Sequence, residues 1–227
     1  MNALSIDCAE TKFCISAKKN ENSASVILDV GMKQSELLVP TIDDVLKKIN
    51  LEPSELHYLA TTSGPGSFTG LRLAFASLKA LSHAFSIPLF AFPTLEVYAH
   101  PFRVLSEPIL CVIDAKKNRF YAGIFLGEKI ILDSGDYELE KIFEGFTNYK
   151  TVHLIGSGAT LFLSRIKNEF PKTKITFSHL DIALVTSQTL FTLSETALAE
   201  NKTPLKDFDG PLYLRKSEAE EKLTKQL

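Results

Sequence analysis

The spacing of apolar residues along this chain switches between the two-residue period of strands and the longer period of helices. Near the N-terminus, three short apolar and β-branched runs are separated by polar residues. These runs predict an antiparallel meander over residues 4–8, 13–18 and 24–30. Residues 35–50 then have helical spacing, with Leu38, Ile42 and Val45 on one apolar face and a proline that must lie near the first turn or kink the helix.

A glycine-rich turn joins the next predicted strand, residues 56–62, to a helix over residues 71–85. The turn consists of Gly64, Pro65, Gly66, Ser67, Phe68, Thr69 and Gly70. A strand, a glycine-rich turn and a helix start in this order can gather backbone N–H groups around an anion. The same residues can equally form a purely structural turn, and their spacing leaves both interpretations open.

The helix after the turn is apolar on two sides. The side expected to face the core carries Leu71, Ala74, Phe75, Leu78, Leu81 and Phe85. The opposite side carries Leu73, Ala76, Ser77, Ala80 and Ala84, with no charged residue among them. Such a helix is either buried all round or shared with another chain. We favour contact with a partner, because a protein of this size has few places to bury a helix on every side.

The second half of the chain repeats the order of elements found in the first. Both halves begin with an apolar strand that ends in an aspartate, Asp7 or Asp114, followed by a polar turn and a second strand. Further predicted elements are strands at 89–92, 120–126 and 152–155 and helices that begin at Thr94, at Ala159 and over 182–200. This weak repeat predicts two α/β halves, residues 1–105 and 106–227, the latter ending in a loosely ordered tail from Lys216.

Composition describes an ordinary soluble protein. Of 227 residues, 45% are hydrophobic and 23% charged, and the net charge of -2 provides no general attraction for nucleic acid. Three scattered cysteines are too few for a disulfide framework or a zinc site. Without a secretory signal or an apolar run that could cross a membrane, we expect a cytoplasmic protein.

Common catalytic motifs fail on spacing. A P-loop counted from Gly64 needs lysine where the chain has Gly70, and a nucleophile elbow needs serine where it has Phe68. No two histidines stand four residues apart, which argues against a helix-borne metal site. Asp7 and Asp114 are better explained as turn caps than as metal ligands.

The segment Gly64-Pro65-Gly66-Ser67-Phe68-Thr69-Gly70-Leu71-Arg72 resembles the signature of the bacterial TsaB (YeaZ) family. Four further matches follow the family's order along the chain. They are Leu4-Ser5-Ile6-Asp7, Ser35-Glu36-Leu37-Leu38-Val39-Pro40, Ile113-Asp114-Ala115-Lys116 and Pro211-Leu212-Tyr213-Leu214-Arg215. The resemblance therefore covers nearly the whole length.

The resemblance implies a two-lobed α/β fold of the actin-like ATPase (actin, Hsp70 and sugar-kinase, or ASKHA) class, with a truncated second lobe. It implies a non-catalytic subunit that binds and activates TsaD, the enzyme that makes N6-threonylcarbamoyladenosine (t6A) at position 37 of tRNA. The ATPase subunit TsaE would join the complex, and the chain alone would form a homodimer. The chain would reach tRNA only through the complex and bind no cofactor or metal alone; ATP or ADP at the complex interface stays open.

The resemblance places the partner surface on the first-lobe helices. The predicted interface residues are Leu38, Ile42, Val45, Arg72, Leu73, Ala76, Ala80 and Ala84. Some of the first three could instead face the core, and the glycine turn would shape the start of the second helix. Two positions depart from many relatives, namely Gln34 in place of histidine and Arg119 in place of glutamate.

Two enzymatic alternatives remain. An ATP-dependent kinase or hydrolase would use Asp7, Asp114 and the glycine turn. However, the sequence Asp7-Cys8-Ala9-Glu10 lacks the glycine of the usual phosphate turn and adds a carboxylate that would repel phosphate. A peptidase that acts on TsaD would need a nucleophile–base pair or a metal site, and the sequence suggests neither.

Overall fold

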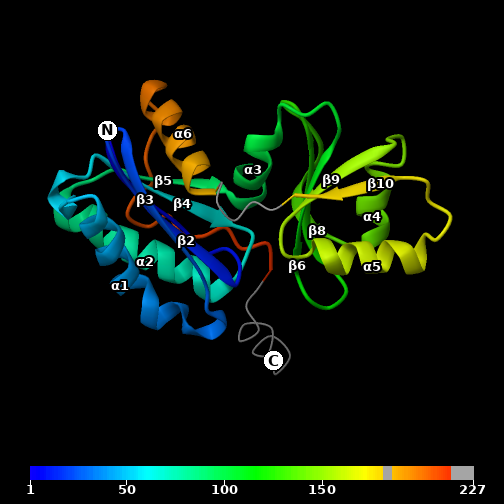
Figure 1. The fold of residues 1–227 in the computed structure, drawn as a ribbon, viewed down its shortest axis with the longest axis horizontal. Helices are drawn as coiled ribbons and strands as arrows, with labels where there is room; N and C mark the ends of the chain where they lie inside the picture. Colours follow the sequence, from blue (N-terminus) through cyan, green and yellow to red (C-terminus); the bar gives the residue numbers. More distant parts are fainter. Residues whose placement is uncertain (181–185, 216–227) are drawn as a thin grey trace.

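The computed structural model describes residues 1–180 and 186–215. It shows two lobes side by side, each built on a five-stranded sheet (Figure 1). The tail predicted from Lys216 lies outside the described residues.

The first sheet has the strand order β3-β2-β1-β4-β5. Its strands are β1 (Asn2–Asp7), β2 (Lys12–Lys19), β3 (Asn22–Asp29), β4 (Tyr58–Gly64) and β5 (Leu89–Pro93). The first three strands pair antiparallel, which confirms the predicted meander. The other two, β4 and β5, run parallel to β1.

The second sheet repeats this arrangement around a central β6. Its strands are β6 (Ile109–Asp114), β7 (Phe120–Leu126), β8 (Lys129–Tyr137), β9 (Thr151–Ile155) and β10 (Thr176–His179). Strands β6, β7 and β8 form a second antiparallel meander, and β9 and β10 add parallel strands on the other side. The predicted pair of related α/β halves is therefore confirmed.

Helices cover both faces of the first sheet, and one helix contacts strands of both sheets (Figure 1). The helices are α1 (Gln34–Lys48), α2 (Phe68–Phe85), α3 (Thr94–Ala99), α4 (Leu139–Glu144), α5 (Ala159–Glu169) and α6 (Thr186–Ala199). Short 3-10 turns lie at Gly31–Lys33, Pro53–Glu55 and His100–Phe102. Helices α1 and α2 pack on one face of the first sheet and α6 on the other, while α3 packs against strands of both sheets.

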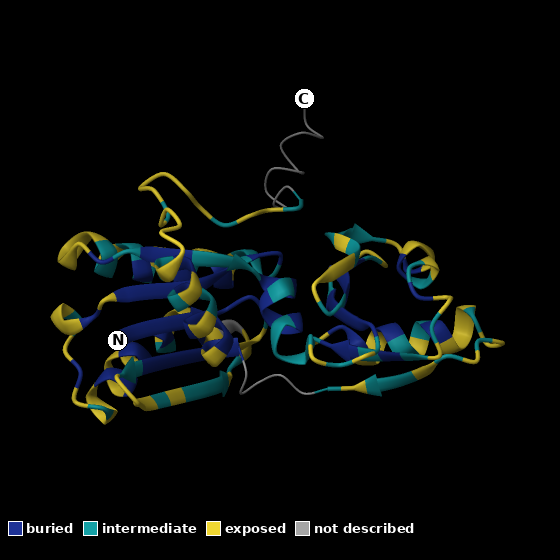
Figure 2. Cartoon of the chain, turned by 90° about the horizontal axis from the view of Figure 1, so that it is seen from above, coloured by how far each residue is buried: buried dark blue, intermediate teal, exposed yellow. Residues whose placement is uncertain are grey.

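The core follows the alternation of side chains along the central strands. Leu4 and Ile6 of β1 pack with α1 and α2, whereas Ala3, which points to the other face of the pleated sheet, packs toward α6. Figure 2 shows the inner strands β1, β2, β4, β6 and β7 as mostly buried, whereas the edge strands β3, β8 and β10 are exposed or half-buried. Burial on both faces explains why these inner strands are apolar runs rather than alternating patterns.

Helix α6 belongs to the first lobe, although it follows the second lobe in the sequence. It packs on β1, β2 and β4, and Glu195 Oε1 accepts hydrogen bonds from Lys18 Nζ at 2.7 Å and from the Tyr58 hydroxyl at 2.9 Å. The prediction that all of 106–227 belongs to the second lobe is therefore wrong for α6, which packs on the first sheet. We still propose that the chain first passes from the first lobe to the second near residue 105.

Candidate functional site: the glycine turn, the cleft and the outer face of α2

The glycine turn is held closely against the β1–β2 turn of the same lobe. The Ser67 N–H donates to the Ala9 carbonyl oxygen at 2.6 Å, and Ser67 Oγ caps α2 by accepting from the Gly70 N–H at 3.2 Å. A Cβ at Gly66 or Gly70 would fall on the backbone of Ala9 or Cys8, so this approach requires glycine at both positions. Two N–H groups that could have bound an anion are therefore already used inside the protein.

Asp7, at the end of β1, caps the adjoining turn. Its Oδ1 accepts hydrogen bonds from the Ala9 N–H at 3.1 Å and the Thr62 hydroxyl at 2.9 Å. Burial raises the pKa of this carboxyl, and these hydrogen bonds oppose the rise. The interpretation of Asp7 as a turn cap is confirmed.

Glu10 connects the first lobe to the second. Its Oε1 accepts a hydrogen bond of 2.9 Å from the Ser157 N–H, just before α5. The pKa of Glu10 is raised, chiefly by burial. Its carboxylate thus occupies the place at the start of α5 where an external anion would otherwise meet the helix N-terminus.

The corresponding turn of the second lobe is built from charged residues. Asp114 accepts from the N–H of Lys116 at 2.8 Å and pairs with its ammonium group at 2.6 Å. Burial alone would raise the pKa of Asp114, but Lys116 lowers it overall. Lys116, Lys117 and Asn118 all have left-handed backbone angles, with φ of 60°, 53° and 61°. Asp114 is thus a turn cap, as we had interpreted it.

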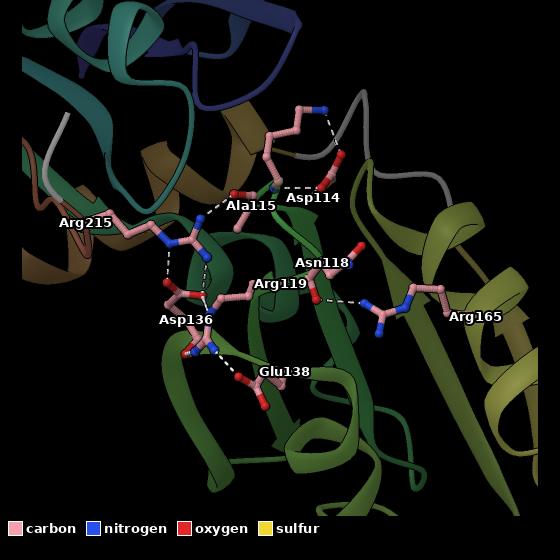
Figure 3. A network of polar contacts seen from close by, with 9 residues as sticks. Asp114, Ala115, Asn118, Arg119, Asp136, Glu138, Arg165 and Arg215 are labelled. Carbon is pink, nitrogen blue, oxygen red and sulfur yellow. Dashed lines mark hydrogen bonds and ion pairs between the residues drawn. The ribbon is translucent and has the colours of Figure 1, made fainter. Parts of the chain in front are cut away.

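The two departures from the family pattern have partners in this protein. Gln34 Nε2 donates to the carbonyl oxygens of Glu10 and Thr11 at 2.8 and 3.1 Å, which ties the start of α1 to the β1–β2 turn. Arg119 donates to Asp136 at 2.8 Å and to Glu138 at 2.7 Å (Figure 3). The reversed charge at position 119 is therefore matched by two carboxylates.

Among the described residues, we consider two cavities between the lobes. The larger, about 430 Å³, is lined by the glycine turn, by residues 113–117 and by residues 212–215, the three segments outside α1 and β1 that carry the family resemblance. The smaller, about 190 Å³, contains Asp7, Glu10, Cys14 and His179. Burial raises the pKa of the Cys14 thiol, which keeps it protonated and a poor nucleophile. Within residues 1–180 and 186–215, no three His, Cys, Asp or Glu side chains are placed to hold a metal ion.

Helix α1 turns its predicted interface residues inward. Leu38, Ile42 and Val45 are all buried in the core of the first lobe, where they pack with β1 and β2. The prediction that they contact a partner is therefore wrong for the folded chain. Their helical spacing identified an apolar face correctly, but that face covers the sheet.

Helix α2 presents the predicted small residues to solvent. Ala76, Ala80 and Ala84 are exposed and Leu73 is half-buried, whereas Leu71, Ala74, Phe75 and Leu78 on the opposite side are buried. We call Leu73, Ala76, Ala80 and Ala84 the α2 face. Phe85, expected in the core, is 43% exposed because α2 ends there, at the left-handed Ser86.

Arg72 lies at the edge of the α2 face, where it has partners in its own chain. Its guanidinium carbon lies 3.8 Å from the centre of the Phe68 ring, and its Nε donates to the Tyr213 hydroxyl at 3.1 Å. The sequence did not predict the contact between Arg72 and Tyr213 or the contacts of Arg215. Both Tyr213 and Arg215 belong to the motif over residues 211–215 that carries the family resemblance. An aromatic ring and a guanidinium group so close together in the sequence were the feature that could have indicated these contacts.

Comparison with known proteins identifies the family of this chain. The sequence profile of the family described as "TsaD: tRNA N6-adenosine threonylcarbamoyltransferase" matches residues 30–223. Relatives named "tRNA threonylcarbamoyladenosine biosynthesis protein TsaB" include those of Buchnera aphidicola (from Acyrthosiphon pisum, 29% identical over 135 residues), Bacillus subtilis (26% over 126) and Escherichia coli (22% over 230). The chain belongs to the TsaB (YeaZ) branch of the TsaD family. The matches cover 59%, 55% and 98% of this chain and 59%, 55% and 98% of the three relatives, so for the first two little more than half of each protein is aligned.

Solved structures show the same fold. A Pseudomonas aeruginosa protein described as having similarity to peptidase YeaZ superposes with a TM-score of 0.77, at 20% identity, over 94% of this chain and 99% of its own. A structure named YeaZ from the same organism gives a TM-score of 0.74 over the same shares. Together with the repeated sheet order, these likenesses confirm the two-lobed α/β fold, which this chain shares with YeaZ. Among the described helices, none is both long and apolar enough to cross a membrane.

Proposed function

We propose that this chain is a non-catalytic subunit of the tRNA t6A37 modification complex, and that it binds and activates the catalytic subunit TsaD through the α2 face. The observation that carries this proposal is the exposed, uncharged α2 face on a helix whose other side packs on the first sheet. Family membership supports the pathway, since the curated relatives are named as t6A biosynthesis proteins.

The α2 face has the properties of an interface between helices. Charged residues are depleted at the cores of protein interfaces, and the α2 face has none. Ala76, Ala80 and Ala84 are small enough to let a partner helix approach closely and pack between them. When the chain is alone, the same face would meet its own copy around a two-fold axis, which accounts for the homodimer we expect.

Catalysis in this proposal belongs to TsaD. Asp7 and Glu10 already bind groups of their own chain, and Cys14 is buried with a raised pKa, which supports neither the kinase nor the peptidase alternative. We further propose that TsaE joins the complex in the cytoplasm, and that this chain reaches tRNA only through the assembly. Any ATP or ADP would then bind at the interface between subunits.

Co-purification with TsaD tests the proposal. TsaD should be retained by the wild-type chain and lost with Ala76→Arg and Ala80→Arg, because each places a charge at the centre of the interface. Ala199→Arg is the matched control, since Ala199 is also an exposed alanine but lies at the end of α6. The two α2 variants should stay folded yet fail to support t6A formation. Undiminished retention of TsaD would refute the proposed interface.

A further inference from the structure

The segment after α6 runs back along α2 before it reaches the cleft. Lys79 of α2 donates to the carbonyl oxygens of Asp207, at 2.5 Å, and of Asp209. Figure 2 shows this segment as a mostly exposed loop ahead of the grey C-terminal trace. The Lys79 ammonium group therefore joins this loop to α2.

Residues 212 and 213 attach the segment to the first lobe. The Leu212 N–H donates to the Ser63 carbonyl oxygen at 2.7 Å, directly before the glycine turn. The Tyr213 ring packs on the Phe68 ring with their centres 4.4 Å apart. Arg72, which contacts both rings, completes this attachment at the first turn of α2.

Two residues further on, Arg215 attaches the segment to the second lobe. Its Nη2 donates to Asp136 Oδ1 at 2.8 Å and its Nε to the other carboxylate oxygen, so the pair is bidentate (Figure 3). Its Nη1 donates to the Ala115 carbonyl oxygen at 2.6 Å. The guanidinium carbon also lies 5.6 Å from the centre of the Tyr121 ring.

The short distance between the two attachments gives them a mechanical consequence. Two extended residues span at most about 7 Å, so Tyr213 and Arg215 can both keep their partners only while the lobes stay close. Helix α3 contacts both lobes in the upper part of their boundary in Figure 1, and the C-terminal segment reaches this boundary below α3. Opening of the cleft below α3 would break one attachment or the other.

We propose that residues 211–215 form a strap that clamps the two lobes across the cleft and links their separation to the position of α2. The link follows from Phe68 and Arg72, which belong to the first turns of the helix that carries the α2 face. Its consequence for partner binding rests on the proposed function. If the chain does bind TsaD through the α2 face, TsaD binds best to the form in which the strap holds the lobes together. Loss of the strap lowers the fraction of chains in that form and so weakens binding.

The clamp can be tested on the chain alone by spin-label distance measurements. Labels on Asp43→Cys of α1 and Ser164→Cys of α5 report the separation of the lobes, and both positions are exposed whereas the native cysteines are buried. The wild type should give one narrow distance distribution. Arg215→Ala and Tyr213→Ala, which remove opposite ends of the strap, should both broaden it toward longer distances.

Arg119→Ala is the matched control, because Arg119 also binds Asp136 but lies within the second lobe. It should leave the distances as in wild type. If either strap variant keeps the wild-type distribution, or if Arg119→Ala broadens it equally, the clamp is overturned.

The link to α2 needs a second measurement, the affinity for TsaD. Arg215→Ala leaves the α2 face unchanged, so its effect must come through conformation; a clamped fraction of one tenth would weaken binding about tenfold. Unchanged affinity in a chain whose lobes have opened would overturn the link. Should Ala80→Arg also bind TsaD normally, the proposed function fails, while the label distances still decide the clamp.

Discussion

The backbone N–H of Ser67 donates to the carbonyl oxygen of Ala9 across 2.6 Å, which joins the glycine turn to the turn between β1 and β2. In a phosphate-binding protein, both turns would direct N–H groups toward a ligand. Here the two turns are hydrogen-bonded to each other instead. The glycines have no side chain, which makes this close contact sterically possible. The turn thereby fixes where α2 begins and which side of the helix faces solvent.

We expect Gly70→Ala to lower the free energy of unfolding by about 1–3 kcal/mol, the usual cost of overpacking. The new methyl group would collide with the Cys8 carbonyl oxygen, which is backbone and cannot rotate away. Gly210→Ala is the control, because a Cβ there meets no atom within 4 Å. Urea denaturation measures both variants; equal midpoints would contradict the structural role of the turn.

Glu195→Gln should destabilise the attachment of α6 by about 1–2 kcal/mol at neutral pH, since hydrogen bonds to a charged group are lost. Burial alone would raise the pKa of Glu195, but Lys18 and Tyr58 lower it below its usual 4.5. A lowered pKa stabilises the fold above pH 4.5, and this contribution disappears as the pH falls through the pKa of the folded state.

The difference in stability between wild type and Glu195→Gln should therefore shrink in acid. Unfolding in urea at pH 7 and at pH 3.5 measures it. Glu200→Gln, which alters an exposed pair with Lys202, should change stability by less than about 0.5 kcal/mol at either pH. A difference independent of pH would show that the Glu195 charge has no part in holding α6.

Arg119→Glu should destabilise the second lobe by about 1–3 kcal/mol, because the new carboxylate would face Asp136 and Glu138. Added salt should recover part of the loss by screening the repulsion. Lys129→Glu makes the same change of charge at an exposed position of β8 and serves as the control. Thermal unfolding at low and high salt tests this; identical behaviour of the two variants would argue against the network in Figure 3.

We expect the isolated chain not to bind Mg·ATP measurably in calorimetric titrations. The Glu10 carboxylate holds the Ser157 N–H at the start of α5, and its negative charge would repel phosphate. Tight binding that Asp7→Ala abolishes would instead restore the ATP-dependent enzyme as the better hypothesis.

The sequence predicted the parts of the fold that depend on local pattern. The N-terminal meander, the start of α5 at Ala159 and the capped glycine turn all follow from periodicity and turn chemistry. Strand β8 was missed because Asp133, Ser134 and Gly135 interrupt its apolar pattern at the edge of the sheet. The short elements α4 and β10, of six and four residues, were not predicted.

The candidate site shows the same limit. Spacing identified apolar faces on α1 and α2, but only the packing of the sheet decided which faces are covered. Leu38, Ile42 and Val45 therefore appeared equivalent to Ala76 and Ala80, and they prove to be core residues. The contacts of Tyr213 and Arg215 depend on groups far away in the chain, which no local pattern could reveal.

The equilibrium affinity of this chain for TsaD tests the central claim most directly. We predict that Ala80→Arg raises the dissociation constant about 100-fold or more, because an unpaired charge buried in an interface costs several kcal/mol. Ala199→Arg should bind TsaD as tightly as wild type. If Ala80→Arg and wild type bind TsaD equally, while both remain folded, the α2 face is not the partner surface and our account is wrong.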